Sequence, residues 1–197
     1  MLEYEITDNY LSSQDFDRLV DNIMPCGYTP RTEGLHSPAN DVTWDVVVKS
    51  VQGYDELKHL KTVTDIKRLE PINDLFMCHM FQRAAYQSQQ FHVIAPILEV
   101  LEPLALARIQ ANLTIQQKEK RRSPFHVDSS SPNRDYGSMM TSIFYMNTTN
   151  GPTILEDGTE IECRANRLVT YPWQVFHAGV LCTDQLYRVV INFNYFK

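Results

Sequence analysis

The spacing of apolar residues divides the chain into a first half with helices and a second half dominated by strands. After Ser12–Asp15, which has the composition of a capping box, apolar residues recur at helical spacing over positions 16–23, and Pro25 follows. We therefore expect a helix that ends before Pro25. A second helix is expected over Phe91–Leu101, with Pro96 in its first turn or interrupting it.

Strand-like segments flank these helices and take over from about residue 104. The first half has two expected strands, Val42–Val51 and Leu75–Phe81, and a short helix at Tyr54–Leu60. The second half contains eight more segments rich in β-branched and aromatic residues: Leu106–Ile115, Phe125–Asp128, Met139–Asn147, Thr153–Leu155, Thr159–Arg164, Arg167–Tyr171, Val175–Val180 and Tyr187–Tyr195.

The spacing of these segments predicts the fold class. Turn residues separate several of them, at Asn150-Gly151-Pro152, at Asp157-Gly158 and at Asn166. Short strands at this spacing are typical of a jelly roll rather than a parallel α/β sheet. We predict one α+β domain over residues 1–197. Its double-stranded β-helix (jelly roll, cupin-like) lies at 106–197, and helices and flanking strands at 1–105 support it.

Composition narrows the function classes. With 43% hydrophobic and 11% aromatic residues, the chain has enough apolar material for a core and is not a disordered protein. A net charge of −6 argues against a protein that mainly grips phosphate backbones, although Lys118, Lys120, Arg121 and Arg122 form a local basic strip. No apolar run reaches the roughly 18–20 residues needed to cross a bilayer.

The cysteines and the N-terminal residues predict a reduced, cytoplasmic setting. Four widely scattered cysteines without a C-x-x-C pair favour free thiols over a disulfide framework or a zinc knuckle: Cys26, Cys78, Cys163 and Cys182. The segment 1–5 has neither the basic start nor the apolar stretch of a signal peptide.

A candidate metal site begins at His126-Val127-Asp128. On a strand, side chains at i and i+2 point to the same face, so both can reach one ion. His177, on a later expected strand, is the third candidate ligand. Two imidazoles and one carboxylate leave three positions of an octahedral ion open, which suits non-haem iron(II) oxygenases, whereas zinc prefers four-coordinate sites. Taken alone, H-x-D is a tripeptide that often occurs by chance. The other histidines have no matching set of candidate ligands and are interpreted as ordinary surface or packed residues: His36, His59, His79 and His92.

Arg188 is the candidate anchor for an acidic ligand. In Tyr187–Phe193 the residues alternate, so that Arg188 shares a face with Val190 and Asn192. An arginine that points into an apolar barrel is costly unless it meets an anion, and its planar fork fits a carboxylate. The alternative is an outward-facing Arg188 paired with Asp184.

The order of these residues resembles the iron(II)/2-oxoglutarate-dependent dioxygenase superfamily, and within it the prolyl-4-hydroxylase-like branch of bacterial or phage type. Tyr145-Met146-Asn147 and the segment Gly151–Leu155 resemble that branch's strand end, glycine turn and short strand. Arg188–Phe196 resembles its final core strand. The resemblance covers roughly residues 106–197.

The resemblance implies a role for each matching residue. His126, Asp128 and His177 match the iron ligands, and Arg188 and Tyr145 match the groups that bind the distal carboxylate of 2-oxoglutarate. The implied cofactors and co-substrates are Fe(II), 2-oxoglutarate and O2, with ascorbate as a stimulant.

Two further residues are weaker candidates for the same pocket, and three departures affect the substrate assignment. Asn192 shares the face of Arg188, and Asn112 is a candidate for the pocket lining. Pro152 replaces the second glycine of the turn, Arg188 stands where many prolyl hydroxylases have lysine, and no tyrosine occurs in Ala111–Gln116.

The implied reaction is hydroxylation of an unactivated C–H bond, with succinate and CO2 as co-products. Peptidyl proline is the leading substrate by analogy, and a small molecule is the next. We do not expect a nucleic-acid partner, because Asn194 stands where alkylation-repair members carry a second arginine. A non-catalytic jelly-roll binding module is the alternative from another class. Ser129–Gly137 is expected to be a loop over the site, either a lid or a plain surface connection.

Overall fold

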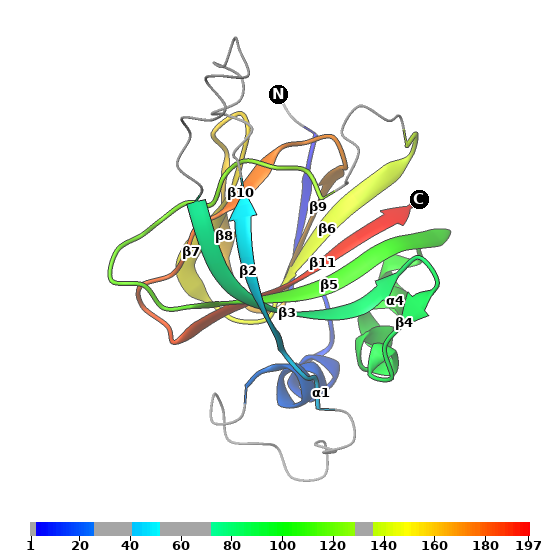
Figure 1. The fold of residues 1–197 in the computed structure, drawn as a ribbon. Coiled ribbons are helices and arrows are strands. Elements are labelled where there is room, and N and C mark those ends of the chain that lie inside the picture. Colours follow the sequence, from blue (N-terminus) through cyan, green and yellow to red (C-terminus); the bar gives the residue numbers. More distant parts are fainter. Residues whose placement is uncertain (1–2, 26–40, 52–71, 129–135) are drawn as a thin grey trace.

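The larger of two antiparallel β-sheets runs across the middle of the molecule, with helices against one of its faces (Figure 1). The computed structural model describes residues 3–25, 41–51, 72–128 and 136–197. The helix predicted at Tyr54–Leu60 and most of the loop predicted at Ser129–Gly137 lie outside these residues. In the described part of the chain, no helix has both the length and the apolar character needed to cross a bilayer.

The large sheet has eight strands, all paired antiparallel. Seven lie in the order β1 (Glu5–Asp8), β9 (Arg167–Pro172), β6 (Met139–Tyr145), β11 (Tyr187–Phe196), β5 (Ala105–Ile115), β3 (Ile72–Arg83) and β2 (Asp45–Val51), and β4 (Tyr86–Gln87) pairs with β3. The edge strand β1 was not predicted from the sequence. Its four residues are all exposed, so they lack the apolar alternation that marks a half-buried strand.

The small sheet contains β10 (His177–Gly179), β7 (Thr149–Leu155) and β8 (Glu160–Cys163), in that order. The turn predicted at Asn150-Gly151-Pro152 is wrong, because these residues lie inside β7. A register shift between Thr149 and Thr153 accommodates Pro152, which has no N–H to give to the ladder. The carbonyl of Pro152 instead accepts from the Val180 amide at 2.9 Å.

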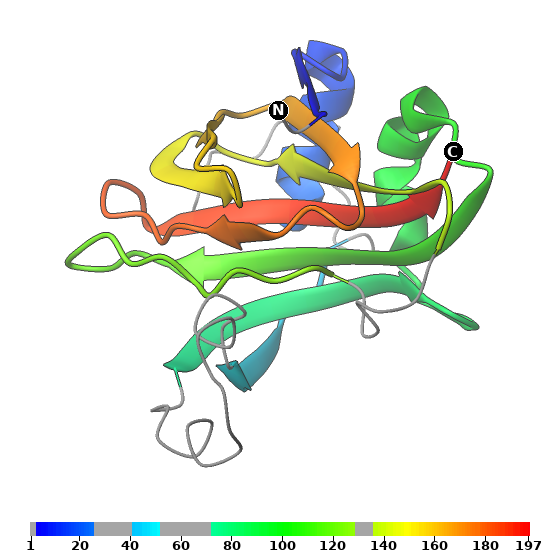
Figure 2. The ribbon, with the colours of Figure 1, turned by 90° about the horizontal axis from the view of Figure 1, so that it is seen from above.

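The helices cover the face of the large sheet that points away from the small sheet (Figures 1 and 2). They are α1 (Ser13–Ile23), the 3₁₀ helix η2 (Phe91–Ile94) and α4 (Ala95–Leu101). The expected cap is confirmed, since the Ser12 side chain accepts from the Asp15 amide at 3.2 Å. Pro96 lies in the first turn of α4, where its missing N–H is tolerated.

Alternation along β11 separates two apolar cores. Val189, Ile191 and Phe193 belong to the cluster that packs under the helices, whereas Val190 belongs to the cluster between the two sheets. Arg188, which is two positions from Val190, therefore shares its inter-sheet face. The two-sheet arrangement confirms the predicted double-stranded β-helix.

The strand predicted at Phe125–Asp128 is wrong in extent. Only two isolated bridges form there, Arg122 with Val180 and His126 with His177. Pro124 lies between the bridges and has no N–H, so a continuous ladder cannot form through it.

Candidate metal centre

Three potential metal ligands lie together between the two sheets. His126, Asp128 and His177 each offer one ligand atom, and these atoms lie within 4.8 Å of one another. In the described part of the chain, no other group of three or more His, Cys, Asp or Glu residues has this geometry. The ligand set expected from the sequence is therefore brought together, although two of its members do not lie on a regular strand.

Reciprocal backbone hydrogen bonds hold the two histidines side by side. The amide of His126 donates to the carbonyl of His177, and the amide of His177 donates to the carbonyl of His126, both at 3.0 Å. Residues paired in this way project their side chains to the same side. The two imidazole centroids are 4.7 Å apart.

Both rings have their Nδ1 atoms next to backbone carbonyl oxygens. The Nδ1 atom of His126 lies 3.0 Å from the carbonyl oxygen of Pro124, and that of His177 lies 3.4 Å from the carbonyl of Val175. A proton on Nδ1 leaves the Nε2 lone pair available, which is the usual arrangement of metal-binding histidines. The buried Nε2 of His177 has no hydrogen-bond partner. Burial, with a contribution from His126, lowers the pKa of His177 to about 4, so the ring is neutral at neutral pH.

Asp128 is held by polar side chains on both carboxylate oxygens. Asn192 and Asn194 place their amide nitrogens 3.3 and 3.2 Å from Oδ2, and Arg108 Nη1 lies 3.4 Å from Oδ1. Burial alone raises the pKa of Asp128, but the electrostatic influence of the His177 imidazole and of Arg108, together with the Asn194 hydrogen bond, outweighs it and brings the pKa to about 2. The carboxylate is therefore ionised and oriented before any cation arrives.

Arg188 of β11 lies deep between the sheets. Its guanidinium is next to Gly179, which is two residues after His177 on β10. Arg188 is only 6% exposed, and its Nε donates to the carbonyl of Gly151 at 2.8 Å. Its Nη2 donates to the Thr153 hydroxyl at 3.1 Å. No carboxylate of the described residues lies within 4.0 Å of this guanidinium. The alternative of an outward Arg188 paired with Asp184 is wrong.

Tyr145 lies beside Arg188, as expected from the sequence. The guanidinium carbon of Arg188 lies 5.8 Å from the centre of the Tyr145 ring. The Tyr145 hydroxyl donates to the Thr153 hydroxyl at 2.8 Å, so Thr153 joins the two residues. Burial raises the pKa of Tyr145 to about 12, against the effect of Arg188, so its phenol stays protonated and can donate to an anion. Sequence reasoning missed Thr153, because only the register Thr153–Gly179 places it beside Arg188.

The two asparagines expected in the co-substrate pocket have different neighbours. Asn192 donates to Asp128. Asn112 shares a strand face with Gln110, whose amide is hydrogen bonded to it, and Gln110 in turn accepts from Arg108 at 2.6 Å. A polar row thus follows β5 toward Asp128. Sequence reasoning missed Arg108 and Gln110, because the alternation of β5 alone does not show which residue meets Asp128.

The donor set fits a divalent metal and an acidic co-substrate. Two imidazoles and one ionised carboxylate are suitable ligands for iron(II), and they leave positions open for further ligands. The hydroxyl and guanidinium groups around Thr153 are donors that lack an acidic partner, and they suit the far carboxylate of 2-oxoglutarate.

Two expectations about other residues are also resolved. His79 is an ordinary packed histidine, because Thr43 and Ser88 engage its two ring nitrogens at 2.8 and 3.1 Å. Three of the cysteines are described and free of disulfides: Cys78, Cys163 and Cys182.

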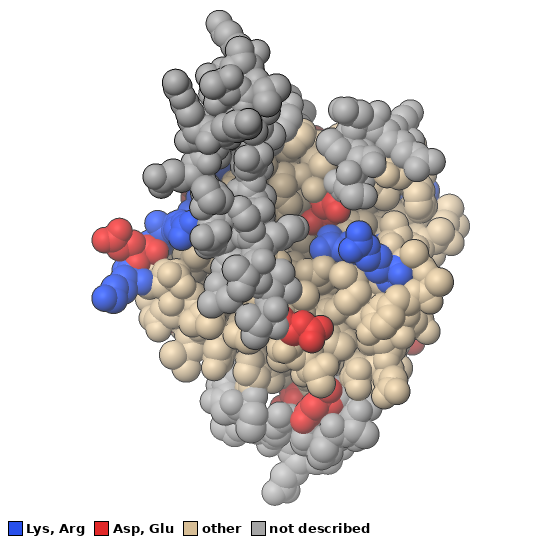
Figure 3. Space-filling view, viewed as in Figure 1, with Lys and Arg blue, Asp and Glu red and all other residues tan. Residues whose placement is uncertain are grey.

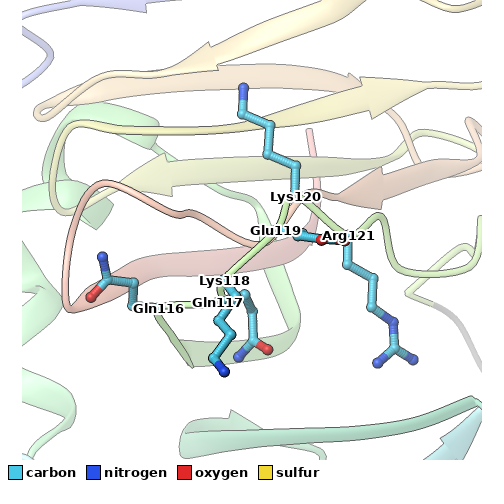
Figure 4. A pocket seen from close by; sticks show the side chains of 6 residues that line it. All are labelled: Gln116, Gln117, Lys118, Glu119, Lys120 and Arg121. Carbon is cyan, nitrogen blue, oxygen red and sulfur yellow. The ribbon is translucent and has the colours of Figure 1, made fainter.

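A surface hollow of about 590 Å³ lies on the segment that follows β5. It is lined by Gln116, Gln117, Lys118, Glu119, Lys120 and Arg121. Figure 4 shows Lys120 and Arg121 pointing in different directions rather than into one shared space. The basic strip noted in the sequence is therefore an exposed connection and not a convergent binding site.

Comparisons with known proteins bear on the fold. No protein-family model matches the chain, and no curated protein matches it. Among solved structures, the viral collagen prolyl hydroxylase of Paramecium Bursaria Chlorella virus-1, in complex with 2OG, is 13% identical. It aligns over 97% of this chain and 94% of its own, with a TM-score of 0.54.

Two further structures align over nearly the whole chain. A prolyl hydroxylase from Trichoplax adhaerens, in complex with a hypoxia inducible factor peptide fragment, is 11% identical over 98% of this chain and 83% of its own, with a TM-score of 0.54. The non-heme alpha ketoglutarate dependent epimerase SnoN from nogalamycin biosynthesis is 11% identical over 100% and 77%, with a TM-score of 0.55. At these identities the likeness shows a shared fold, so the chemistry has to be argued from the residues.

Proposed function

We propose that this chain, which has the double-stranded β-helix fold of the 2OG-Fe(II) oxygenases, is an iron(II)- and 2-oxoglutarate-dependent dioxygenase. The proposed reaction hydroxylates an unactivated C–H bond. One atom of O2 enters the product hydroxyl and the other enters succinate, while the 1-carboxylate of 2-oxoglutarate leaves as CO2.

The observation that carries this proposal is a metal-ligand cluster close to a buried guanidinium that pairs with no acid among the described residues. His177 pairs with Leu155 in the small sheet, and Gly179 pairs with Thr153, which holds Arg188. Two residues along a strand span roughly 7 Å. A five-carbon dicarboxylate with its keto acid at the metal can place its far carboxylate at that distance. A buried arginine is stable only with such a partner or with full hydrogen bonding, which supports an anion here.

Different residues of the chain have different roles in the proposed reaction. Bound iron(II) would activate dioxygen at the His126–Asp128–His177 face, with 2-oxoglutarate supplying two electrons. Asn192 and Asn194 keep the Asp128 carboxylate oriented, so that no reorganisation is needed when the cation binds.

The apolar residues around the site keep water out. Tyr145 and Tyr171 are fully buried between the sheets, and Trp173 is nearly so. A dry site strengthens the attraction between Arg188 and a carboxylate and protects reactive species from hydrolysis. The chain thus supplies binding, orientation and exclusion of solvent.

The direct test is anaerobic addition of iron(II) and 2-oxoglutarate to the purified protein. We expect a weak visible metal-to-ligand charge-transfer band, followed by succinate formation when oxygen is admitted. Metal binding without this band would contradict the proposal and favour a non-catalytic binding module. Adding ascorbate to the same assay tests the predicted stimulation.

Replacing His126 with alanine tests the ligand assignment. His126→Ala removes one of three ligands, so we expect loss of the charge-transfer band and of iron-dependent succinate formation, with an unchanged far-UV circular dichroism spectrum. The matched control is His92→Ala, because His92 is an exposed histidine on η2. If His126→Ala turned over 2-oxoglutarate like the parent, the proposed metal centre would be wrong.

Two substrate classes merit testing within this reaction. Two of the three compared structures are prolyl hydroxylases, which supports a trial with proline-containing peptides. Small molecules are the other class. A nucleic acid is not proposed, because the net charge is −6 and Asn194 supplies an amide where a second cation would be needed.

A further inference from the structure

Arg108 lies at the metal centre but is not needed to hold metal or co-substrate. It is on β5, where it faces the same side as Gln110, and its side chain is 22% exposed. Its guanidinium has two contacts, with the Gln110 amide oxygen at 2.6 Å and with Asp128 at 3.4 Å. Arginine carries five N–H donors, so several remain for a ligand.

A second arginine, Arg83, lies directly opposite Arg108 on the neighbouring strand. Register pairing places Arg83 of β3 against Arg108 of β5, and directly paired residues share a face of the sheet. Like charges in this position repel one another. No carboxylate of the described residues lies within 4.0 Å of Arg83, and Asp128 is the single acid this close to Arg108. Of these two paired arginines, only Arg108 contacts a carboxylate within the described part of the chain, and the proposed metal also uses that carboxylate.

Cationic side chains gather on one part of the surface. Figure 3 shows Lys and Arg atoms together right of centre on the viewed face, over the large sheet, with Asp or Glu atoms directly above them. Positive charge at the surface attracts anions from solution.

Two buried amide oxygens without hydrogen-bond partners among the described residues lie next to Asp128. Asn192 and Asn194 are 6% and 4% exposed, and their amide nitrogens face the Asp128 carboxylate, which can only accept. Their Oδ1 atoms consequently point elsewhere, and neither has a hydrogen-bond partner. Asn194 pairs with Arg108 in the sheet register, so this acceptor and the spare donors of Arg108 lie side by side.

The two arginines near the metal ligands, Arg188 and Arg108, are well separated along the large sheet. Arg188 pairs with Thr114 and Asn194 pairs with Arg108, which places the two arginines at opposite ends of the β5–β11 ladder. Six residues of a strand span about 20 Å. A 2-oxoglutarate that binds the metal and Arg188 therefore leaves Arg108 unoccupied.

We propose that Arg108 and Arg83 bind the anionic group, a carboxylate or a phosphate, of a small substrate. Because Arg108 contacts Asp128, a substrate held there has its C–H bonds near the metal. This inference rests on the proposed function and names its substrate class.

The test compares acids with matched neutral amides on the anaerobic iron(II)–2-oxoglutarate complex. The probes are the free L-amino acids, proline included, and their C-terminal amides, and each acid that binds is also compared with its phosphonate analogue. Binding is followed as a shift of the charge-transfer band and, after oxygen is admitted, as hydroxylated product. We expect at least one acid to bind about 10- to 100-fold more tightly than its amide, the effect of a charge-assisted hydrogen bond.

Variants separate a binding role from a structural one. Arg108→Gln should remove the preference for the acid over the amide, and Arg83→Gln should reduce it several-fold. A purely structural Arg108 would instead weaken acid and amide equally. Arg18→Gln, on the exposed side of α1, is the matched control and should keep the parent's preference. A preference for the phosphonate over the carboxylate would identify phosphate as the recognised group.

The outcomes distinguish the two proposals. If the charge-transfer band forms in the parent but no probe is preferred in its anionic form, the Arg108–Arg83 site is wrong and the oxygenase proposal stands. A preference that survives Arg108→Gln also overturns the site. If the band itself never forms, the oxygenase proposal fails first.

Discussion

At the scale of single residues, the candidate site is marked by buried polar groups that lack a hydrogen-bond or charge partner within the described part of the chain. His177 leaves a buried Nε2 without a partner, and Arg188 is buried with no acid of the described residues within 4.0 Å. Such groups are normally satisfied, because an unpaired buried donor, acceptor or charge reduces stability. Their concentration between the two sheets indicates a place built for ligands rather than for packing.

Removing the Arg188 guanidinium should weaken co-substrate binding. Arg188→Ala deletes the donors that we assign to the far carboxylate of 2-oxoglutarate, so we expect the KM for 2-oxoglutarate to rise about 10- to 100-fold. The readout is succinate formation as a function of 2-oxoglutarate concentration. Arg164→Ala, at an exposed arginine beyond β8, is the control and should not shift this curve. Unchanged saturation in Arg188→Ala would contradict the assignment.

At the scale of elements, the bulge in β7 shapes the co-substrate end of the site. The carbonyl of Gly151 accepts from Arg188, and a Cβ atom added at Gly151 would lie 2.3 Å from the carbonyl oxygen of Val180. Only glycine allows the two backbones to approach this closely. The central residue of the expected turn, Gly151, is thus needed for sheet packing and for holding Arg188.

Gly151→Ala should therefore destabilise the protein. The contact is with backbone and cannot be relieved by rotating a side chain, so we expect a loss of about 1–3 kcal/mol in the free energy of unfolding. Urea denaturation of both proteins measures this. Gly179→Ala is the matched control on β10, since its added Cβ meets no atom closer than 3.6 Å. Equal losses in the two variants would show that the close approach at Gly151 is unimportant.

At the scale of the whole molecule, the N-terminal strand is tied to the sheet by an ion pair that links residues far apart in the sequence. Arg167 donates from Nη2 to Asp8 at 2.9 Å, and its side chain is 8% exposed while that of Asp8 is 47% exposed. The hydrogen bond from Arg167 lowers the pKa of Asp8 against the effect of burial. This pair closes the edge of the large sheet at β1 and β9.

Loss of this ion pair should change stability in a pH-dependent way. The folded pKa of Asp8 is depressed, so its stabilising effect is present above the unfolded pKa of about 4 and is lost as the pH falls through the folded value. Asp8→Asn should lower stability at pH 7 by about 1 kcal/mol or less, and the difference should shrink below about pH 4. Thermal unfolding across pH checks this. A pH-independent effect of Asp8→Asn would exclude the ion pair as the cause.

Local patterns in the sequence determined the faces of the strands and the identities of the candidate ligands. Alternation along a pleated strand is a local property, so it correctly placed Arg188 on the same inward face as Val190. The fold class followed from the number and spacing of strands. The turn at Gly151 was misjudged because glycine and proline also occur where strands approach closely or bulge.

Only the tertiary structure decided which distant residues meet. His126 is paired with His177 through two backbone hydrogen bonds. The Thr153 hydroxyl accepts hydrogen bonds from both Arg188 and Tyr145. Arg108 forms an ion pair with Asp128. These contacts depend on the register between strands, and a shift of register would separate them without altering any local pattern. For this protein, residue identity and alternation determined which groups face the barrel. The register of the two sheets decided that they form one site with a cationic group on either side of the metal ligands.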